Sequence, residues 1–294
     1  MLSICIPTYN YDVTPLLTAL VSQASRLEHT VEILVRDDHS QTFKLSQLTV
    51  PESTISIQTF TNTSNIGRTA TRAALADDAK FDHLLFLDAD TLPVDDKFLT
   101  RFEPFYSQEV DVVSGGIAYL KEKPAPDYRL RWTFGHAREA RKASERQLHP
   151  YLIVSGSLWV KKDLFITINP KEHNAYGLDN LISNRLSQNQ ATVVHIDNPV
   201  YHLGLETNTV FLEKSLKAID SLYENEQNDP SLLKHTRLQQ QYEKYRKTGL
   251  TTAFYLAIHP MISRLKRKAI SAQPSLRAFD FIRLHHYIKR QRNG

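Results

Sequence analysis

Over its first two hundred residues the chain alternates between short apolar runs and helical patterns, and this alternation limits its fold more than any other feature. The apolar runs are five to seven residues long and rich in Val, Ile, Leu and Phe. They cover Leu2–Ile6, Glu32–Arg36, Ile55–Phe60, His83–Leu87 and Val110–Gly116. Such runs, bounded by Pro, Gly, Asn or Asp, are typical of strands buried on both faces of a mainly parallel sheet.

Helix signals lie between these runs. Thr14 predicts an N-cap and Pro15 the first helical position. The Ala-rich segment Arg68–Asp78 and the segment Phe98–Phe105, which follows two acidic residues, are also expected to be helical. Strands and helices repeated in this way predict a doubly wound α/β fold, whose ligands bind at the carboxyl ends of the strands.

The pattern changes farther along the chain. Two further strands are expected over Tyr151–Val160 and Val193–Tyr201, with a helix over Leu178–Gln188 between them. After Gly204 the pattern is helical, over about Thr209–Glu226, Ser231–Lys247, Thr251–Arg267 and Leu276–Arg290. We therefore expect an α/β domain followed by a helical extension.

Composition excludes several classes of protein. With 294 residues, 41% of them hydrophobic, the chain is not globally disordered and can form one large domain with an appendage. A single Cys excludes a disulfide framework and any zinc site made of cysteines. The first residues lack the basic start of a signal peptide, and no apolar run approaches the roughly 20 residues that span a bilayer. We therefore expect a cytoplasmic protein.

The net charge of +4 is unevenly distributed. The last 34 residues contain nine Lys or Arg and one acidic residue, Asp280, so they carry +8 and the rest of the chain carries −4. In 251–294 the basic residues are mixed with apolar ones such as Phe254 and Phe281. Interfacial helices that bind anionic lipids have this composition, so we expect peripheral contact with the inner face of a membrane. A packed appendage or a dimerisation arm is the alternative, and no recognition motif supports nucleic-acid binding.

Polar residues follow four successive predicted strands. They are Pro7–Asn10, Arg36–Ser40, Asn65–Arg68 and Asp88–Asp90. Because the carboxyl ends of parallel strands meet at one edge of a sheet, we expect these residues to converge. Asp88 and Asp90 form a DxD pair, and carboxylates combined with water and substrate phosphates are what Mg²⁺ or Mn²⁺ prefers. A divalent ion there would neutralise a diphosphate and make it a better leaving group.

The other three segments offer complementary chemistry. Asp37 and Asp38 provide acceptors for a base N–H or for ribose hydroxyls, and Tyr9 provides a flat face for stacking. Arg68 is suited to bidentate contact with a phosphate. Each residue alone has a structural explanation, as a turn, a helix cap or a solvated surface residue. Their convergence at one sheet edge is what favours a ligand site.

The sequence resembles the family 2 glycosyltransferases, which have the GT-A fold, over about residues 1–205. The matching segments, in chain order, are SICIPTYN, ILVRDDHS, NIGRTATRAAL, LLFLDADTLP, SGSLWVKKDLF and YGLDNLISNRL…HIDNPVYHLG. The resemblance implies a Rossmann-like, mixed, mainly parallel sheet flanked by helices. It also implies a catalytic domain over 1–205, with a nucleotide-binding half (1–117) and an acceptor and catalytic half (118–205). A helical, basic extension over 206–294 would follow.

Roles in donor binding are implied by the same resemblance. Pro7 and Tyr9 would belong to the nucleotide-binding residues, with Tyr9 against the nucleotide base, and Asp38 would accept the N–H of the base. Arg68 would approach the base or a phosphate. The resemblance to the family at Tyr9 and Asp38 favours UDP as the nucleotide.

The resemblance also implies a metal site for Mn²⁺ or Mg²⁺. Asp88 would hold the ribose and the metal region, and Asp90 would bind the metal and the diphosphate. His202 matches a histidine that completes the metal coordination in many GT-A enzymes. Without the family context, His202 would be interpreted as a structural residue.

The catalytic base is where the chain departs from the family. Inverting members carry Glu-Asp at the start of the acceptor-side helix, often as G-x-E-D, with the Asp as base, whereas residues 177–180 here are GLDN. Because the amide of Asn180 cannot remove a proton, we expect Asp179 to be the base, although a shift of one residue rotates a side chain by about 100° on a helix. A helix N-cap is the alternative role for Asp179. Glu172 and Asp163 are weaker substitutes.

The resemblance thus implies an inverting, metal-dependent enzyme of the hexosyltransferase type. It would move a sugar from a nucleoside-diphosphate sugar, through an oxocarbenium-like state, to a saccharide or lipid-linked acceptor in cell-surface polysaccharide or glycolipid synthesis. The basic stretch Lys121–Pro150 would form the acceptor wall. Trp132 within it would stack on a sugar or pack in the core.

Two other classes of function stay open. A sugar-nucleotide nucleotidyltransferase is also an α/β protein with metal carboxylates. It opens, however, with a Gly-rich GxGxR-type loop, which Pro7–Asn10 is not. A catalytically inactive binding or scaffold protein with the GT-A fold is kept open by Asn180.

Overall fold

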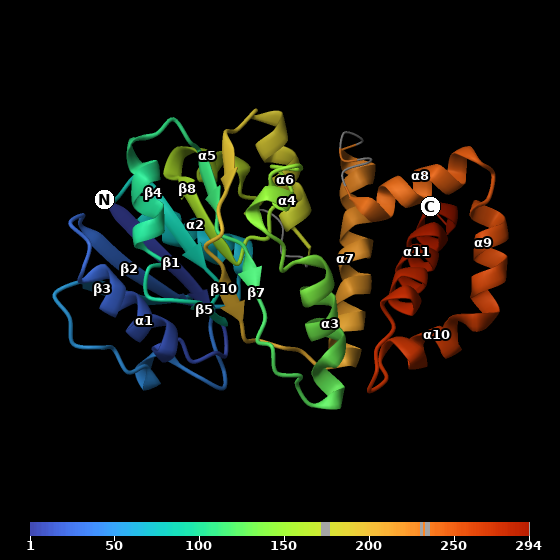
Figure 1. Cartoon of the computed structure of the whole chain (residues 1–294), viewed down its shortest axis with the longest axis horizontal. Coiled ribbons are helices and arrows are strands. Elements are labelled where there is room, and N and C mark those ends of the chain that lie inside the picture. Colours follow the sequence, from blue (N-terminus) through green and yellow to red (C-terminus); the bar gives the residue numbers. More distant parts are fainter. Residues whose placement is uncertain (172–176, 230–231, 233–235, 294) are drawn as a thin grey trace. The chain divides into compact units, whose positions relative to one another are not determined.

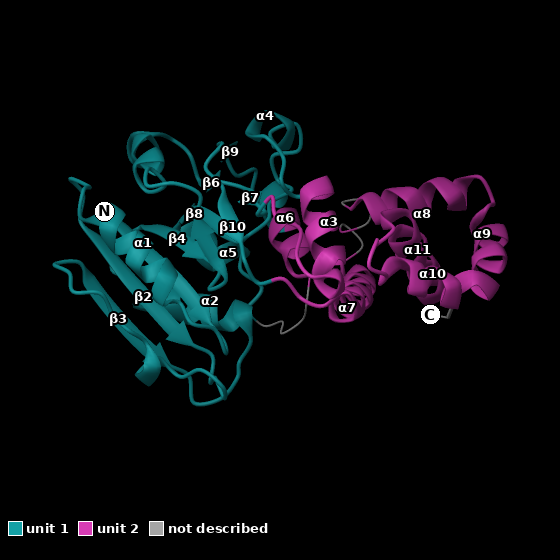
Figure 2. Cartoon of the chain, turned by 60° about the horizontal axis from the view of Figure 1, so that its bottom comes forward, with its two compact units in different colours: residues 1–120, 139–174, 185–204 teal, residues 121–138, 175–184, 205–294 magenta. Residues whose placement is uncertain are grey.

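The computed structural model describes residues 1–171, 177–229, 232 and 236–293. The chain forms two compact units, coloured separately in Figure 2. Unit 1 comprises Met1–Leu120, Glu139–Asn174 and Arg185–Gly204, and unit 2 comprises Lys121–Arg138, Ala175–Asn184 and Leu205–Gly294. Unit 2 thus takes in two segments that precede residue 205, and the domain boundary expected there stays a prediction.

A seven-stranded sheet forms the centre of unit 1 (Figure 1). Its strands are β1 (Leu2–Thr8), β2 (Val31–Asp37), β3 (Ser56–Thr61), β4 (His83–Leu87), β6 (Val112–Ser114), β8 (Ser157–Lys161) and β9 (Val193–His195). Their order across the sheet is β3-β2-β1-β4-β8-β6-β9. Only β8 runs antiparallel to its two neighbours. Since β1 is buried along its whole length, its apolar sequence reflects burial on both faces, and the predicted mixed, mainly parallel α/β fold is confirmed.

The helices of unit 1 follow the predictions unevenly. They are α1 (Thr14–Ala24), α2 (Arg68–Asp78), α4 (Ala143–Arg146), α5 (Lys162–Ile168) and the 3₁₀ helices η1 (Leu45–Gln47) and η2 (Thr100–Ser107). α2 has the predicted bounds. Thr14 is not an N-cap but the first helical residue, and its N–H donates to Asp12 Oδ1 at 2.9 Å. The helix expected over Phe98–Phe105 is η2, and Pro104 within it provides no N–H for an α-helical turn.

Unit 1 also has a second, three-stranded sheet, and three strand predictions are corrected in their bounds. The order of this sheet is β5 (Thr91–Pro93), β10 (Val200–His202) and β7 (Ile117–Ala118). The run Val193–Tyr201 is not a single strand, because it contains β9 of the large sheet and most of β10 of the small one. The run Val110–Gly116 is a strand only over β6, and β7 begins just after it. The run Tyr151–Val160 is a strand only from Ser157 onward.

Unit 2 is helical. Its elements are η3 (Pro126–Tyr128), α3 (Arg129–Arg138), the start of α6 (Asp179–Gln188), α7 (Asn208–Asn228), α8 (Arg237–Lys247), α9 (Thr251–Ile258), η5 (His259–Met261), α10 (Ile262–Ala269) and α11 (Leu276–Asn293). Leu130, Phe211 and Phe279 form part of its core. The helix expected over Thr251–Arg267 is interrupted by η5, which contains Pro260. No helix among the described residues is long and apolar enough to cross a membrane.

Candidate active site

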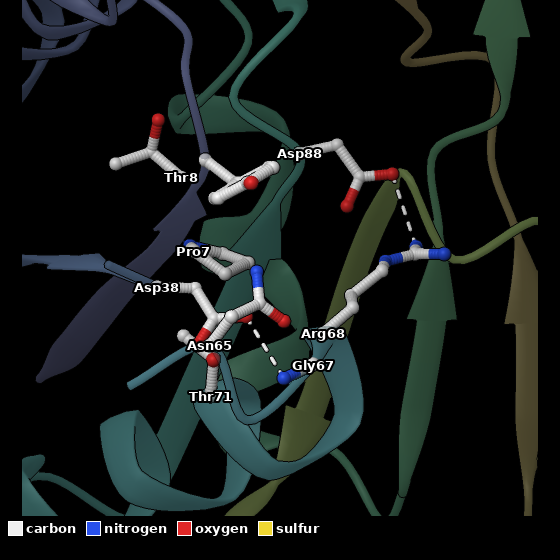
Figure 3. A pocket seen from close by; sticks show the side chains of 9 residues that line it. Pro7, Thr8, Asp38, Asn65, Gly67, Arg68, Thr71 and Asp88 are labelled. Carbon is white, nitrogen blue, oxygen red and sulfur yellow. Dashed lines mark hydrogen bonds and ion pairs between the residues drawn. The ribbon is translucent and has the colours of Figure 1, made fainter. Parts of the chain in front are cut away.

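A pocket of about 290 Å³ opens in unit 1 where β1, β2 and β4 end (Figure 3). Its lining residues are Pro7, Thr8, Tyr9, Asp38, Asn65, Gly67, Arg68, Thr71 and Asp88. These residues come from all four segments that were expected to converge at this sheet edge. Tyr9 is 49% exposed, which leaves part of its ring accessible to a ligand.

Asp38 is buried beneath this pocket and holds the loop before α2. Its Oδ1 accepts hydrogen bonds from the backbone N–H of Ile66 at 2.8 Å and from the side-chain amide of Asn62 at 2.9 Å. Its Oδ2 accepts from the N–H of Gly67 at 2.8 Å. Gly67 has a φ of +85°, in the left-handed region that favours glycine. The carboxylate therefore shapes the pocket floor, and only Oδ2 keeps a position for a further donor.

Asp88 is clamped by two arginines on one face of α2. Arg68 donates to Asp88 Oδ2 at 3.0 Å, as Figure 3 shows, and Arg72 donates to Asp88 Oδ1 at 2.8 Å. The two arginines are four residues apart, so they lie on the same side of the helix. Arg68 is 46% exposed whereas Arg72 is 2% exposed. Arg68 can therefore also reach a ligand, and Arg72 is an internal partner of the carboxylate.

Sequence analysis missed Arg72 and a residue that supports both arginines, Ser155. Arg68 donates to Ser155 Oγ at 2.8 Å, and Arg72 donates to the Ser155 carbonyl at 2.7 Å. The spacing of four between the arginines was a signal that could have found Arg72. Nothing local marked Ser155, because it comes from a distant segment of the chain.

Asp90 lies beside His202 because of strand pairing. β5 starts directly after Asp90 and pairs with β10, so that His202 lies opposite Thr91. Asp90 Oδ2 is 3.5 Å from His202 Nε2. A Cβ at Gly204 would lie 2.0 Å from Asp90 Oδ2, so the close approach of the backbone there requires glycine.

The two carboxyl groups of the DxD pair have different electrostatic environments. Burial alone would raise the pKa of Asp88, but Arg68, Arg72 and His202 together hold it below its usual range. Burial raises the pKa of Asp90, and the charge of Asp88 adds to this, whereas His202 and Arg68 act in the opposite direction. Asp88 is therefore the charge-compensated member of the pair, and Asp90 is the one that a further cation would stabilise.

The residues at this edge fit a divalent cation only in part. Within the described parts of the chain, no group of three or more His, Cys, Asp or Glu has the geometry to hold a metal ion. Asp90 and His202 do present an oxygen and a nitrogen side by side, and the buried Nδ1 of His202 has no hydrogen-bond partner among the described residues. Two protein ligands are enough for Mg²⁺ or Mn²⁺, because these ions usually complete their coordination with phosphate oxygens and water. Asp90 and His202 thus fit the implied ion, while Asp88 is held by arginines.

The predicted catalytic and acceptor residues belong to unit 2. Asp179 is the first residue of α6, in the position of a first-turn acid. Trp132 lies on α3 with its ring centroid 4.4 Å from that of His136. The roles of Asp179 as base and Trp132 as acceptor contact stay predictions. Of the two weaker substitutes, Asp163 is exposed in the first turn of α5, and Glu172 lies outside the described residues.

Several basic residues of the stretch Lys121–Pro150 have structural partners. Arg146 donates to the carbonyls of Gly115 and Ile196 at 3.1 and 2.7 Å in unit 1. Arg138 pairs with Asp280 at 2.6 Å in unit 2. Arg138 and Arg146 therefore stabilise the packing of their own units, so not every basic residue of this stretch is accounted for by an acceptor wall.

The family model described as Glycosyl transferase family 2 matches residues 3–167. No curated protein matches the chain significantly in sequence.

Among solved structures, S. aureus TarS resembles the chain with a TM-score of 0.51 and 16% identity over 99% of this chain, which spans 55% of TarS. TarS 1–349 in complex with UDP-GlcNAc gives a TM-score of 0.50 at 16% identity, over 99% of this chain and 90% of the other. The mannosyltransferase PcManGT from Pyrobaculum calidifontis, in complex with GDP-Man and Mn²⁺, gives 0.52 at 14% identity, over 99% and 86%. These likenesses show a shared fold.

Proposed function

The chain belongs to glycosyltransferase family 2, and from this premise we propose that it transfers a sugar from a nucleoside-diphosphate sugar, preferably a UDP-sugar, to a saccharide or lipid-linked acceptor. The observation that carries the proposal is the pocket at the ends of β1, β2 and β4, with the pair Asp90 and His202 next to the carboxylate of Asp88. The complexes of TarS with UDP-GlcNAc and of PcManGT with GDP-Man support a nucleotide-sugar donor.

Donor binding is assigned to the pocket residues of unit 1. The half-exposed ring of Tyr9, which follows Pro7, stacks on the base, and Asp38 keeps the loop in place and offers Oδ2 to a base N–H. Arg68 is exposed enough to place its guanidinium against a phosphate while it stays paired with Asp88.

The diphosphate side of the reaction is assigned to Asp90 and His202, which would hold Mn²⁺ or Mg²⁺. When bound, the ion would neutralise the diphosphate and make the nucleotide a better leaving group. Arg68 adds a positive charge at the same edge, which stabilises the charge that develops on the departing diphosphate.

Proton transfer is assigned to Asp179. Its carboxylate accepts the proton of the acceptor hydroxyl while that oxygen attacks the anomeric carbon and the bond to the diphosphate breaks. Displacement on the side opposite the leaving group inverts the anomeric centre. The family resemblance supports the proposal that the product is a cell-surface polysaccharide or glycolipid.

Nucleotide release from a panel of nucleotide sugars tests the proposal. With Mn²⁺, we expect slow release of nucleotide from one donor by hydrolysis and faster release when the acceptor is present. Chelation of the metal should abolish both the hydrolysis and the acceptor-dependent release. Thermal unfolding with and without nucleotide provides an independent binding readout, because a bound ligand raises apparent stability. A protein that releases no nucleotide from any donor and gains no stability from any nucleotide is the inactive scaffold instead.

A further inference from the structure

The segment 247–268 of unit 2 contains only basic charges. It runs from the end of α8 through α9 and η5 into α10, and it has five Lys or Arg and no Asp or Glu. The basic residues are Lys247, Arg264, Lys266, Arg267 and Lys268, and all five are exposed. Arg246, just before the segment, is paired with Glu243 at 2.9 Å and is not counted. This segment of unit 2 therefore presents an exposed surface whose own charges are all positive.

Exposed apolar residues lie between these charges at helical spacing. They are Ala253, Leu256 and Ala257, which follow the i, i+3, i+4 pattern of one face of α9, and Pro260 and Met261, which follow in η5. Leu256 is 63% exposed and Met261 is 44% exposed, and Leu250, at the turn before α9, is 51% exposed. A helix that packs on its own core would bury such a stripe. We call this surface, residues 247–268 with its apolar stripe, the basic-apolar face.

Aromatic residues on the opposite side of α9 hold the stripe outward. The ring of Phe254 lies 5.3 Å from that of Tyr245 on α8 and 5.9 Å from that of Phe281 on α11. Tyr255 stacks on His285 of α11 at 4.7 Å. Since these contacts occupy the inner side of α9, rotating the helix to bury Leu256 would expose three aromatic contacts. Figures 1 and 2 show α9 and α10 beside α11 in this unit.

We propose that the basic-apolar face binds the surface of an anionic lipid bilayer. Leu250, Leu256 and Met261 would insert at the boundary between headgroups and acyl chains, while Arg264 to Lys268 contact lipid phosphates. The charge of the face is complementary to anionic headgroups, and its apolar stripe matches the layer beneath them. This inference goes beyond the proposed transfer reaction and does not depend on it.

Two other occupants match the face less well. A soluble polyanion would pair with the basic residues but would leave Leu256 and Met261 in water. A second copy related by two-fold symmetry would bring five further positive charges against these five, because such an interface uses the same patch on both partners. The combination of charge and exposed apolar residues therefore favours a bilayer.

Co-sedimentation of the full chain with vesicles tests the proposal. We expect binding to phosphatidylcholine vesicles that contain phosphatidylglycerol, weaker binding at high salt, and little binding to phosphatidylcholine alone. The double variant Arg264→Glu/Lys268→Glu should reduce the partition coefficient about tenfold or more, since each basic residue near the surface contributes roughly fivefold. Leu256→Ser/Met261→Ser should reduce it by a similar factor through lost insertion.

Matched controls separate the face from general charge and hydrophobicity. Lys44→Glu/Lys97→Glu makes the same change in net charge at exposed positions of unit 1, and Leu148→Ser removes a leucine that is 76% exposed. Both should bind as the parent chain does, and circular dichroism verifies that every variant is folded.

Three outcomes would overturn the proposal. One is equal binding to the two kinds of vesicle, and another is an equal loss in the control variants. The third is the absence of vesicle binding. Binding to soluble polyphosphate, or a dimer that Leu256→Ser/Met261→Ser dissociates, would then assign the face to one of the other occupants.

Discussion

The donor edge of unit 1 and the basic-apolar face of unit 2 both concentrate charged residues, but in opposite ways. By the donor edge we mean the pocket at the strand ends of unit 1, with Asp90 and His202, named after the function proposed for it. At the donor edge Arg72 and Ser155 are buried, and the charge of Asp88 is met by two arginines within 3.0 Å. On the basic-apolar face the charges are exposed and all of one sign. Paired and buried charges hold a geometry in place, as chemistry on a diphosphate requires. Exposed charges of one sign attract an extended partner instead.

The largest expected effect tests whether the donor edge carries the reaction. Asp90→Ala should lower transfer on the order of a thousandfold or more and abolish metal-stimulated nucleotide binding, because a main ligand of the ion is lost. Initial rates with saturating Mn²⁺ and nucleotide titrations measure both effects. Asp96→Ala, which removes an exposed aspartate of the same unit, is the control and should change neither. Full activity of the Asp90 variant would reject this site.

The next prediction asks whether unit 2 contributes to the chemistry. Asp179→Asn should reduce turnover by about 10² to 10⁴ and leave donor binding unchanged, because only the proton acceptor is lost. Asp163→Asn is the matched control, since it removes another first-turn helix carboxylate and should retain turnover. If turnover were lost in the Asp163 variant and kept in the Asp179 variant, Asp163 and not Asp179 would be the catalytic base.

A third prediction compares the two arginines that share Asp88. Arg72→Met should destabilise the protein by about 3 kcal/mol, because it removes the buried partner of a partly buried carboxylate. Arg68→Met should cost less than about 1 kcal/mol, because this side chain is partly exposed. Urea unfolding measures both. Similar losses for the two variants would show that burial does not distinguish them.

The smallest expected effect concerns the interior of unit 2. Burial lowers the pKa of His285 to about 4, and its neighbours His259, Lys289, His286 and Lys266 act in the same direction. In the unfolded chain the pKa of this histidine is near 6.5, so as the pH falls His285 is protonated in the unfolded state before it is protonated in the folded state. The contribution of the neutral ring is complete above about pH 6.5 and is lost as the pH falls toward 4.

Unfolding free energies measured across this range should decrease by about 1–2 kcal/mol more in the parent chain than in His285→Gln. His149→Gln removes an exposed histidine and should behave as the parent does. If the unfolding free energy of His285→Gln decreased with falling pH as much as that of the parent chain, another group would be responsible for the decrease.

Much of the fold was predictable because its signals are local. The run His83–Leu87 and helix Arg68–Asp78 appear in the structure with the predicted bounds, since each is marked by its own residues and their immediate neighbours. The run Val193–Tyr201 failed as a single strand, because a change from one sheet to another leaves no local mark in the sequence. Thr251–Arg267 failed as one helix at Pro260, where a breaker was visible in the sequence.

The site was predictable to a similar degree. Tyr9, Arg68 and Asp88 meet at one pocket, as strand ends predicted. That Asp38 is occupied by backbone N–H groups was not predictable, because its partners come from a loop 28 and 29 residues away.

By itself, the sequence determined which residues follow each strand and hence which side chains can reach the donor edge, because alternation and turn residues act over a few positions. Tertiary structure alone decided that His202 lies against Asp90, that Arg72 is buried while Arg68 is not, and that the apolar stripe of α9 points outward. These outcomes depend on strand register and packing between distant segments. A linear pattern does not contain them, because it records neighbours along the chain and not those in space.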